Sequence, residues 1–266
     1  MENYTPVIVI ERVSDNYPLA IVLYKRRDKL EQFTSVIVPA YNEQDLIGGC
    51  LDSLLNQSMD RDQFEIVVVN NNSTDLTEKI ALDKGVRVEN EDRKGYVFAI
   101  HKGIEASRGE IIAFTDADCR VPGDWLEKIQ SNFAYSEDII AVGGKLTFYD
   151  IPRILDRLVW IILYPIHALP GNNMAIKREA IRRIGGIDMN VNLSLDFWLT
   201  RKLRKVGRLK IDRSLLVMTS GRRFSGSFSS DLKYFINVIF IWLSSRPLFF
   251  DFPDVREGSG WRSYAK

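Results

Sequence analysis

The stretch Ile111-Ile112-Ala113-Phe114-Thr115-Asp116-Ala117-Asp118 is an apolar run that ends in two carboxylates one residue apart. Such a run is typical of a buried β-strand whose carboxyl end emerges into a cleft. In open α/β sheets, ligands collect at the carboxyl ends of the strands. If the chain leaves extended geometry after Asp116, both carboxylates can face one point, where a hard divalent cation would bridge them to phosphate oxygens. The residues alone leave open an ordinary Asp-rich turn.

Further apolar runs predict strands around this one, at Thr34–Pro39, Glu65–Val69, Val86–Val88, Ala141–Phe148 and Ser214–Thr219. Apolar residues at helical spacing, with turn residues before them, predict helices at about 46–55, 75–84 and 94–106 and from 124 onward. An α/β fold is therefore expected. Polar, short side chains follow the first two strands, and they indicate a nucleotide site built from loops at one sheet edge.

The composition suits one α/β domain with appendages in a chain of 266 residues. The formal net charge is +1, so no whole-chain field recruits nucleic acid, and no nucleic-acid partner is expected. Cys50 and Cys119 are too few for a disulfide framework, so reduced thiols are expected. The N-terminus lacks the pattern of a secretory signal, and no apolar run reaches the roughly 18 residues of a spanning helix. A cytoplasmic location follows, with or without peripheral contact to the cytoplasmic face of a membrane.

Four motifs, in order and spacing, resemble the family 2 glycosyltransferases of the GT-A fold. They are Val36-Ile37-Val38-Pro39-Ala40-Tyr41-Asn42-Glu43, Val68-Val69-Asn70-Asn71-Asn72-Ser73-Thr74-Asp75, Asp116-Ala117-Asp118, and Gly171-Asn172-Asn173-Met174-Ala175 with Gly185-Gly186-Ile187-Asp188. The likeness covers about residues 33 to 212. It implies a three-layer α/β/α sandwich with a central, mostly parallel sheet and a Rossmann-like nucleotide-binding half. The expected domains are a β-hairpin extension at 1–32, the GT-A domain at 33–225, and an apolar helix and tail at 226–266.

The resemblance also implies the chemistry. Such enzymes move a sugar from a nucleotide-diphosphate donor, UDP- or GDP-linked, to an acceptor with inversion at the anomeric carbon. Asp118 would ligate Mg²⁺ or Mn²⁺ on the diphosphate, and Asp116 would hold the ribose or assist the metal. Physically, the cation offsets the negative charge that accumulates on the leaving diphosphate.

Further donor contacts follow from the same likeness. The nucleoside would lie against Pro39, Ala40, Tyr41 and Glu43, with Asn70 beneath the base. Relatives commonly carry Asp at the Asn70 position. Asn keeps an acceptor oxygen but loses the charge, so the choice between uridine and guanosine donors stays open.

The resemblance also implies a carboxylate base just before the helix that follows the Gly-Gly-Ile-Asp turn, where it would take the proton of the acceptor hydroxyl. Asp196 occupies that position, although Leu195 replaces the acidic residue that usually precedes it. The residue type alone is equally consistent with an Asp that favours a helix N-terminus. Leu195 indicates either a different acceptor subclass or reduced activity.

Three basic side chains are candidates for contact with the donor phosphates. Lys94 precedes Gly95 at a helix start, where a phosphate or a plain Gly-initiated helix would fit. Arg222 and Arg223 follow a Gly and suit either an anion or a solvated turn. His101 and His167 have no metal-ligand partner at useful spacing and are interpreted as structural or surface histidines.

Two apolar segments, Leu155–Leu169 and Tyr234–Leu243, are too short to span a bilayer and have basic residues at their margins. Contact with a membrane interface is favoured over packing on each other or a homodimer contact, because Trp, Tyr and flanking arginines suit an interface. A polyprenyl-linked or cell-surface glycan acceptor would then follow.

The expected activity is that of a hexosyltransferase-type glycosyltransferase in glycan biosynthesis. The alternative is a degenerate relative that binds sugar nucleotides without turnover, because Asn70 and Leu195 depart from the family pattern. A nucleotidyltransferase would need a Gly-rich, Arg-bearing loop after the first strand, which Pro39–Glu43 lacks. A dinucleotide-dependent dehydrogenase would need Gly-x-Gly-x-x-Gly after an early strand, and none is present.

Overall fold

The computed structural model of the chain describes four stretches and four single residues. These are 7–11, 20–24, 32–150 and 168–222, with Ile236, Phe240, Ser244 and Leu248. The chain divides into two compact units, Met1–Gln32 and Phe33–Lys266. In the first unit, β1 (Val7–Glu11) pairs antiparallel with β2 (Ala20–Tyr24).

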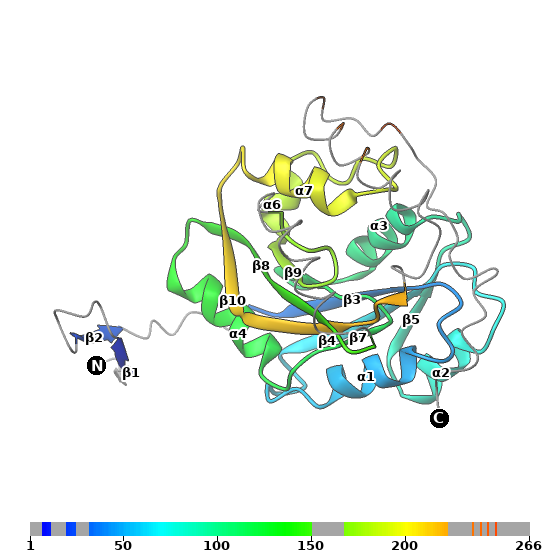
Figure 1. Cartoon of the computed structure of the whole chain (residues 1–266), viewed down its shortest axis with the longest axis horizontal. Helices are drawn as coiled ribbons and strands as arrows, with labels where there is room; N and C mark the ends of the chain where they lie inside the picture. Colours follow the sequence, from blue (N-terminus) through cyan, green and yellow to red (C-terminus); the bar gives the residue numbers. More distant parts are fainter. Residues whose placement is uncertain are drawn as a thin grey trace. The chain divides into compact units, whose positions relative to one another are not determined.

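A single sheet forms the centre of the second unit (Figure 1). Its strands are β3 (Thr34–Ala40), β4 (Phe64–Asn70), β5 (Arg87–Asn90), β6 (Ile111–Phe114), β7 (Cys119–Arg120), β8 (Ile139–Phe148), β9 (Met174–Lys177) and β10 (Arg208–Thr219). They lie in the order β5-β4-β3-β6-β9-β8-β10-β7. Within the described part, β9 and β7 are antiparallel to their neighbours and all other pairings are parallel.

The central strands read as continuous apolar runs because both faces of the sheet are covered. Successive side chains point to opposite faces, so Val36 and Val38 enter one apolar cluster and Ile37 enters the other. In β4, Ile66 and Val68 alternate with Val67 and Val69 in the same way. Polar side chains on these strands would therefore be costly anywhere but at the strand ends.

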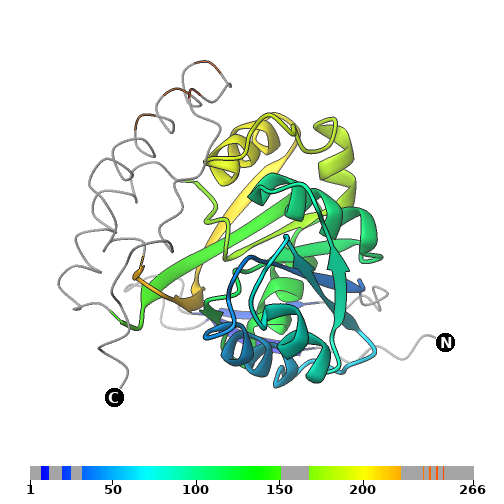
Figure 2. The same cartoon turned by 90° about the vertical axis from the view of Figure 1, so that its right-hand side faces the viewer.

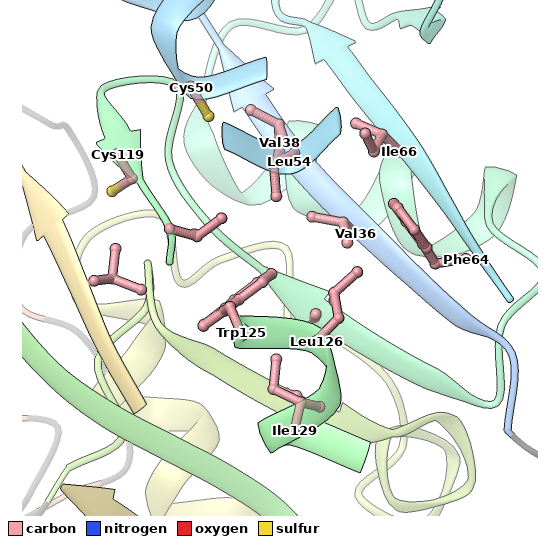
Figure 3. Packing of buried hydrophobic residues seen from close by; sticks show 14 of the residues in the cluster. Val36, Val38, Cys50, Leu54, Phe64, Ile66, Cys119, Trp125, Leu126 and Ile129 are labelled. Atoms are coloured by element: carbon pink, nitrogen blue, oxygen red, sulfur yellow. The ribbon is translucent and has the colours of Figure 1, made fainter. Parts of the chain in front are cut away.

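Helices form a layer on each face of the sheet (Figure 1, Figure 2). Buried residues of α1 (Ile47–Leu55), α2 (Thr77–Asp83) and α4 (Trp125–Tyr135) belong to the first cluster. Those of α3 (Tyr96–Ala106), α6 (Arg178–Arg183) and α7 (Leu195–Leu203) belong to the second. Figure 3 shows Trp125 and Leu126 pointing into the first cluster with Val36. The predicted three-layer α/β/α sandwich with a mostly parallel sheet is confirmed.

Two short strands were not expected. β9 lies antiparallel between β6 and β8, and β7 closes the edge beside β10. Segments of four and two residues are too short for a period-two pattern to be recognised. Their pairing is decided by tertiary contacts, which place the Asn173 motif at the centre of the sheet.

Most of Leu155–Leu169 and Tyr234–Leu243 lies outside the described residues, so the membrane-interface and dimer hypotheses stay predictions. Among the described residues, no helix combines the length and apolar character needed to cross a membrane.

Gly144→Ala should strongly destabilise the fold. A Cβ at this position in β8 would clash with the carbonyl group of Leu215 and the side chain of Asn173, and neither the strand nor the buried amide can move cheaply. We expect a loss of about 2 kcal/mol or more, measured by chemical denaturation.

The matched control is Gly48→Ala, in the first turn of α1. The nearest atom to an added Cβ there is Lys84 Cε at 3.7 Å, so the substitution should stabilise the fold by about 0.5–1 kcal/mol. Equal effects of the two substitutions would contradict the close packing of β8 against β10.

Candidate functional site

The candidate site lies at the edge of the sheet where the parallel strands end. Asn70 is the last residue of β4, and Asp116 comes two residues after β6. Glu43 lies three residues after β3, and Arg222 lies three residues after β10. The parallel directions of these strands bring segments far apart in the sequence to one place.

Asp116 and Asp118 flank a tight turn after β6. The turn is closed by a hydrogen bond of 3.0 Å from the backbone N–H of Cys119 to the carbonyl of Asp116. The Thr219 hydroxyl lies 3.3 Å from Asp118 Oδ1, and the Tyr149 hydroxyl donates to the Asp118 carbonyl at 3.2 Å. The ends of β8 and β10 therefore fix Asp118, whose side chain stays 13% exposed.

Arg222 joins two carboxylates across this edge. Its Nη2 lies 2.5 Å from Glu43 Oε1 and 3.1 Å from Asp118 Oδ2. Desolvation lowers the pKa of the guanidinium, but the hydrogen bond to Glu43 and the charge of Asp118 outweigh it and raise the pKa above its usual value. The arginine is a permanent cation between two partly or fully buried anions.

The backbone before Arg222 is held by Asp150, at the end of β8. The Asp150 carboxylate accepts hydrogen bonds from the Ser220 hydroxyl and from the Gly221 N–H. The Ser220 hydroxyl in turn lies 3.3 Å from the Arg222 N–H. The position of the guanidinium thus depends on a turn that spans β8 and β10. Arg223 lies outside the described residues.

Asn70 is buried, and both ends of its amide serve the protein. Its Oδ1 accepts from the Ser73 N–H at 3.2 Å, and its Nδ2 donates to Asn90 Oδ1 at 2.8 Å. Asn42 adopts a left-handed conformation with φ of 50° and its Oδ1 accepts from the Thr74 N–H at 2.8 Å. These bonds brace the loops after β3 and β4 against each other, and one lone pair of the Asn70 oxygen is already used.

The start of α3 is held by two buried asparagines. Asn71 Oδ1 accepts from the Gly95 N–H at 2.9 Å, and Asn192 Oδ1 accepts from the Val97 N–H at 3.1 Å. Gly95 has φ of 149°, which favours glycine. These N–H groups are therefore not offered to a phosphate. The exposed Lys94 ammonium instead lies 3.0 Å from the Tyr41 hydroxyl.

Tyr96 lies between the two halves of the site. Its hydroxyl is 3.4 Å from Asp116 Oδ1 and 3.7 Å from where a Cβ would stand on Gly171, while that same point is 3.3 Å from Asp196 Cβ. Desolvation raises the pKa of Tyr96 well above its usual value, and the charges of Asp116 and Asp196 raise it further. The phenol is therefore a neutral hydrogen-bond donor beside both acids.

Asp196 lies in the first turn of α7, partly exposed, next to Gly171. Leu195 is buried in the apolar cluster beneath α3 and α7. A carboxylate at position 195 would have to enter that cluster, which gives a physical account of why the acidic neighbour is missing.

The remaining predicted contacts are placed differently. Pro39 and Ala40 are buried within β3, and the Ala40 carbonyl accepts from the Asn71 N–H at 2.8 Å. Of that motif, the side chains of Tyr41 and Glu43 contact other predicted site residues, Lys94 and Arg222 respectively. Sequence reasoning missed the roles of Asn71, Tyr96, Asp150, Asn192 and Thr219, because each depends on a partner far away in the chain.

Within the described stretches, no group of three or more His, Cys, Asp and Glu side chains could hold a metal ion. Asp116 and Asp118 offer carboxylate oxygens from one turn. Two carboxylates suit a hard cation that takes its other ligands from water and from phosphate oxygens, as Mg²⁺ commonly does. Burial raises the pKa of the thiols of Cys50 and Cys119, so both stay protonated and are poor ligands.

Comparison with known families and structures gives consistent matches. A model of the family Glycosyl transferase family 2 matches residues 35–185. Glycosyltransferase AglE of Haloferax volcanii is 35% identical over 122 residues, which cover 44% of this chain and 40% of that protein. The chain spans half or less of the length of the first four curated relatives that it matches.

Two solved structures share the fold. The mannosyltransferase PcManGT from Pyrobaculum calidifontis, in complex with GDP-Man and Mn²⁺, has a TM-score of 0.62 at 26% identity and covers 72% of this chain and 58% of that chain. S. aureus TarS 1-349, in complex with UDP-GlcNAc, has a TM-score of 0.61 at 18% identity and covers 78% and 65%. At 18% identity the second likeness concerns the fold alone.

The loop before Lys94 should depend on pH through Glu91. Hydrogen bonds from Arg93 lower the pKa of this buried carboxyl from 4.5 to about 2, although desolvation opposes the shift. Because the folded-state pKa lies below the unfolded value, the stabilisation is complete above pH 4.5 and is lost as the pH falls through about 2.

Glu91→Gln should therefore lower the urea midpoint at pH 7, and the difference from the native chain should shrink between pH 4 and pH 2.5. Glu179→Gln removes an exposed ion pair and is the control, with little expected effect at any pH. If the difference in urea midpoint between Glu91→Gln and the native chain stays constant with pH, the Glu91–Arg93 ion pair is not its origin.

Proposed function

The chain belongs to glycosyl transferase family 2, and on that premise we propose that it transfers a sugar from a UDP- or GDP-linked donor to an acceptor hydroxyl with inversion. The observation that carries the proposal is the meeting of Asp116, Asp118, Asn70 and Asp196 at the carboxyl edge of one sheet. In such folds this edge is where nucleotides bind. The relative PcManGT, in complex with GDP-Man and Mn²⁺, supports the donor class.

Mg²⁺ or Mn²⁺ is the proposed cofactor, held by Asp118 with help from Asp116. Both carboxylates are partly exposed. Two carboxylates do not fill the coordination sphere of such an ion, so positions are left for diphosphate oxygens. When bound, such an ion stabilises the negative charge of the leaving diphosphate. Lys94 lies beside Tyr41 at the same edge, where its ammonium would face the donor phosphates.

Asp196 is the proposed general base. During transfer, a bond forms between the acceptor oxygen and the anomeric carbon while the bond from that carbon to the diphosphate oxygen breaks. The acceptor proton passes to the Asp196 carboxylate. Tyr96 and Gly171 lie between Asp196 and Asp116, so the proposed base and the proposed metal ligands belong to one continuous site.

The acceptor proposed from the two apolar segments is a polyprenyl-linked or cell-surface glycan, reached by a peripheral membrane contact. The competing function is sugar-nucleotide binding without turnover. Two observations favour it: Leu195 is buried at the position where the family resemblance implies an acid, and the Asn70 amide is bonded within the protein. The two functions differ in whether Asp196 is needed for anything beyond binding.

Asp118→Asn should remove metal-dependent donor binding while the fold stays intact. In wild-type protein, one nucleoside diphosphate in a panel should raise the melting temperature more with Mn²⁺ than without it, because a ligand that binds the native state stabilises it. The variant should lose the Mn²⁺-dependent part of the shift. Asp124→Asn, which breaks an exposed pair with Lys128, is the control. An unchanged shift in Asp118→Asn would remove this residue from the site.

Asp196→Asn should keep donor affinity and lose transfer. The amide cannot take up the acceptor proton, so we expect kcat to fall by about 10²-fold or more with little change in donor binding. Exposed Asp188, eight residues earlier, provides the control variant Asp188→Asn. A protein that binds donor but shows neither transfer nor hydrolysis before mutation would favour the binding function instead.

A further inference from the structure

Arg222 occupies the place where the proposed site needs a cation. Its Nη2 lies between Glu43 Oε1 at 2.5 Å and Asp118 Oδ2 at 3.1 Å. The Glu43 side chain is 3% exposed and that of Asp118 is 13% exposed, so neither charge is well solvated. Burial of two neighbouring carboxylates is costly unless a positive group offsets them. In this structure that group is Arg222.

Hydrogen bonds to the turn before Arg222 hold the arginine in this position. Asp150 fixes the Ser220–Gly221 turn, and Thr219 in the last position of β10 reaches the other oxygen of Asp118. These hydrogen bonds fix the end of β10 and the turn after it, and they thereby position the Arg222 backbone. The Glu43 backbone is fixed separately, by a hydrogen bond of 2.7 Å from its N–H to the Thr77 hydroxyl.

A divalent ion on Asp118 would compete with this arrangement. A metal ion bound to a carboxylate oxygen would stand within a few ångströms of the guanidinium nitrogen that now contacts Asp118. Like charges at that separation repel strongly in a poorly solvated site. The divalent ion and the Arg222 guanidinium therefore compete for Asp118. Binding of the ion weakens the ion pair between Arg222 and Asp118.

We propose that Arg222 is an exchangeable cation: it neutralises Asp118 and Glu43 when no metal ion is bound, yields Asp118 to the divalent ion when the donor binds, and then contacts the diphosphate. This inference rests on the proposed function. It implies that metal binds weakly without nucleotide, that nucleotide and metal bind cooperatively, and that donor binding moves the Ser220–Arg222 turn. The guanidinium changes from a competitor of the metal to a ligand of the phosphate.

The test is one substitution that should change two affinities in opposite directions. With Mn²⁺ alone and no nucleotide, Arg222→Gln should bind the ion about tenfold more tightly than the native chain, because a competing charge is gone. With a nucleoside diphosphate and saturating Mn²⁺, the same variant should bind the nucleotide about tenfold more weakly, because a phosphate ligand is gone. Free Mn²⁺ is read by electron paramagnetic resonance, and nucleotide affinity by calorimetry.

Arg120→Gln is the matched control for general electrostatics. Arg120 is exposed, two residues beyond Asp118, and stacks over the Tyr149 ring at 5.0 Å. The Arg120→Gln substitution removes one positive charge near the site but leaves the ion pairs of Arg222 with Glu43 and Asp118 in place, so both affinities should change by less than about twofold. Arg222→Lys keeps the charge but loses the fork geometry. Arg222→Lys should increase the affinity for Mn²⁺ without nucleotide by only about threefold. This variant replaces Arg222→Gln in the test if Arg222→Gln does not fold.

Unchanged or weaker binding of Mn²⁺ alone by Arg222→Gln would overturn the exchange, as would a rise of the same size in Arg120→Gln. The metal-only measurement needs no nucleotide. If the native chain binds no nucleoside diphosphate, the proposed function fails, while the sign of the metal-only effect still tests the competition at Asp118.

Discussion

The site depends on one constraint: strands that are buried on both faces can carry charged side chains only where they end. In β3 and β4, the successive side chains of Val36–Val38 and Ile66–Val69 enter one apolar cluster or the other. The neighbouring parallel strands end at the same edge, so their polar termini are forced together. The candidate site is in this sense a consequence of the core, and it is placed by the same alternation that makes the three layers.

The negative charge gathered at this edge needs a positive group to offset it. Glu43, Asp116 and Asp118 lie there with little solvent, and Arg222 offsets two of them. Around them, amides rather than charges set the geometry, since Asn71 and Asn192 fix the start of α3, and Asn70 and Asn42 tie two loops together. If Arg222 exchanges with a metal ion as we propose, this edge suits a ligand that brings its own counterion. A nucleotide diphosphate with a divalent ion is such a ligand.

Much of this could be predicted from the sequence because it rests on local patterns. The apolar runs at β3, β4 and β6 and the paired carboxylates after β6 are visible without coordinates, and they give the α/β fold and the Asp116–Asp118 position. β9 could not be predicted in this way, because its four residues carry no pattern and its antiparallel pairing is decided by its neighbours. Arg222 was expected near an anion. Its actual partner is a carboxylate 179 positions away, and no spacing rule connects the two. Tyr96 was missed for the same reason, and the bonded state of the Asn70 amide appears only once its loop is folded.

The most direct test of the whole account is a crystal structure of the chain with Mn²⁺ and the nucleoside diphosphate that stabilises it best. Anomalous scattering locates the ion without reference to any assumed site. The account predicts an Mn²⁺ peak about 2–2.5 Å from an Asp118 carboxylate oxygen and from diphosphate oxygens, with the base over Asn70 and Arg222 turned from Asp118 to the phosphates. An ion bound away from Asp116 and Asp118, or a nucleotide at another edge of the sheet, would contradict it.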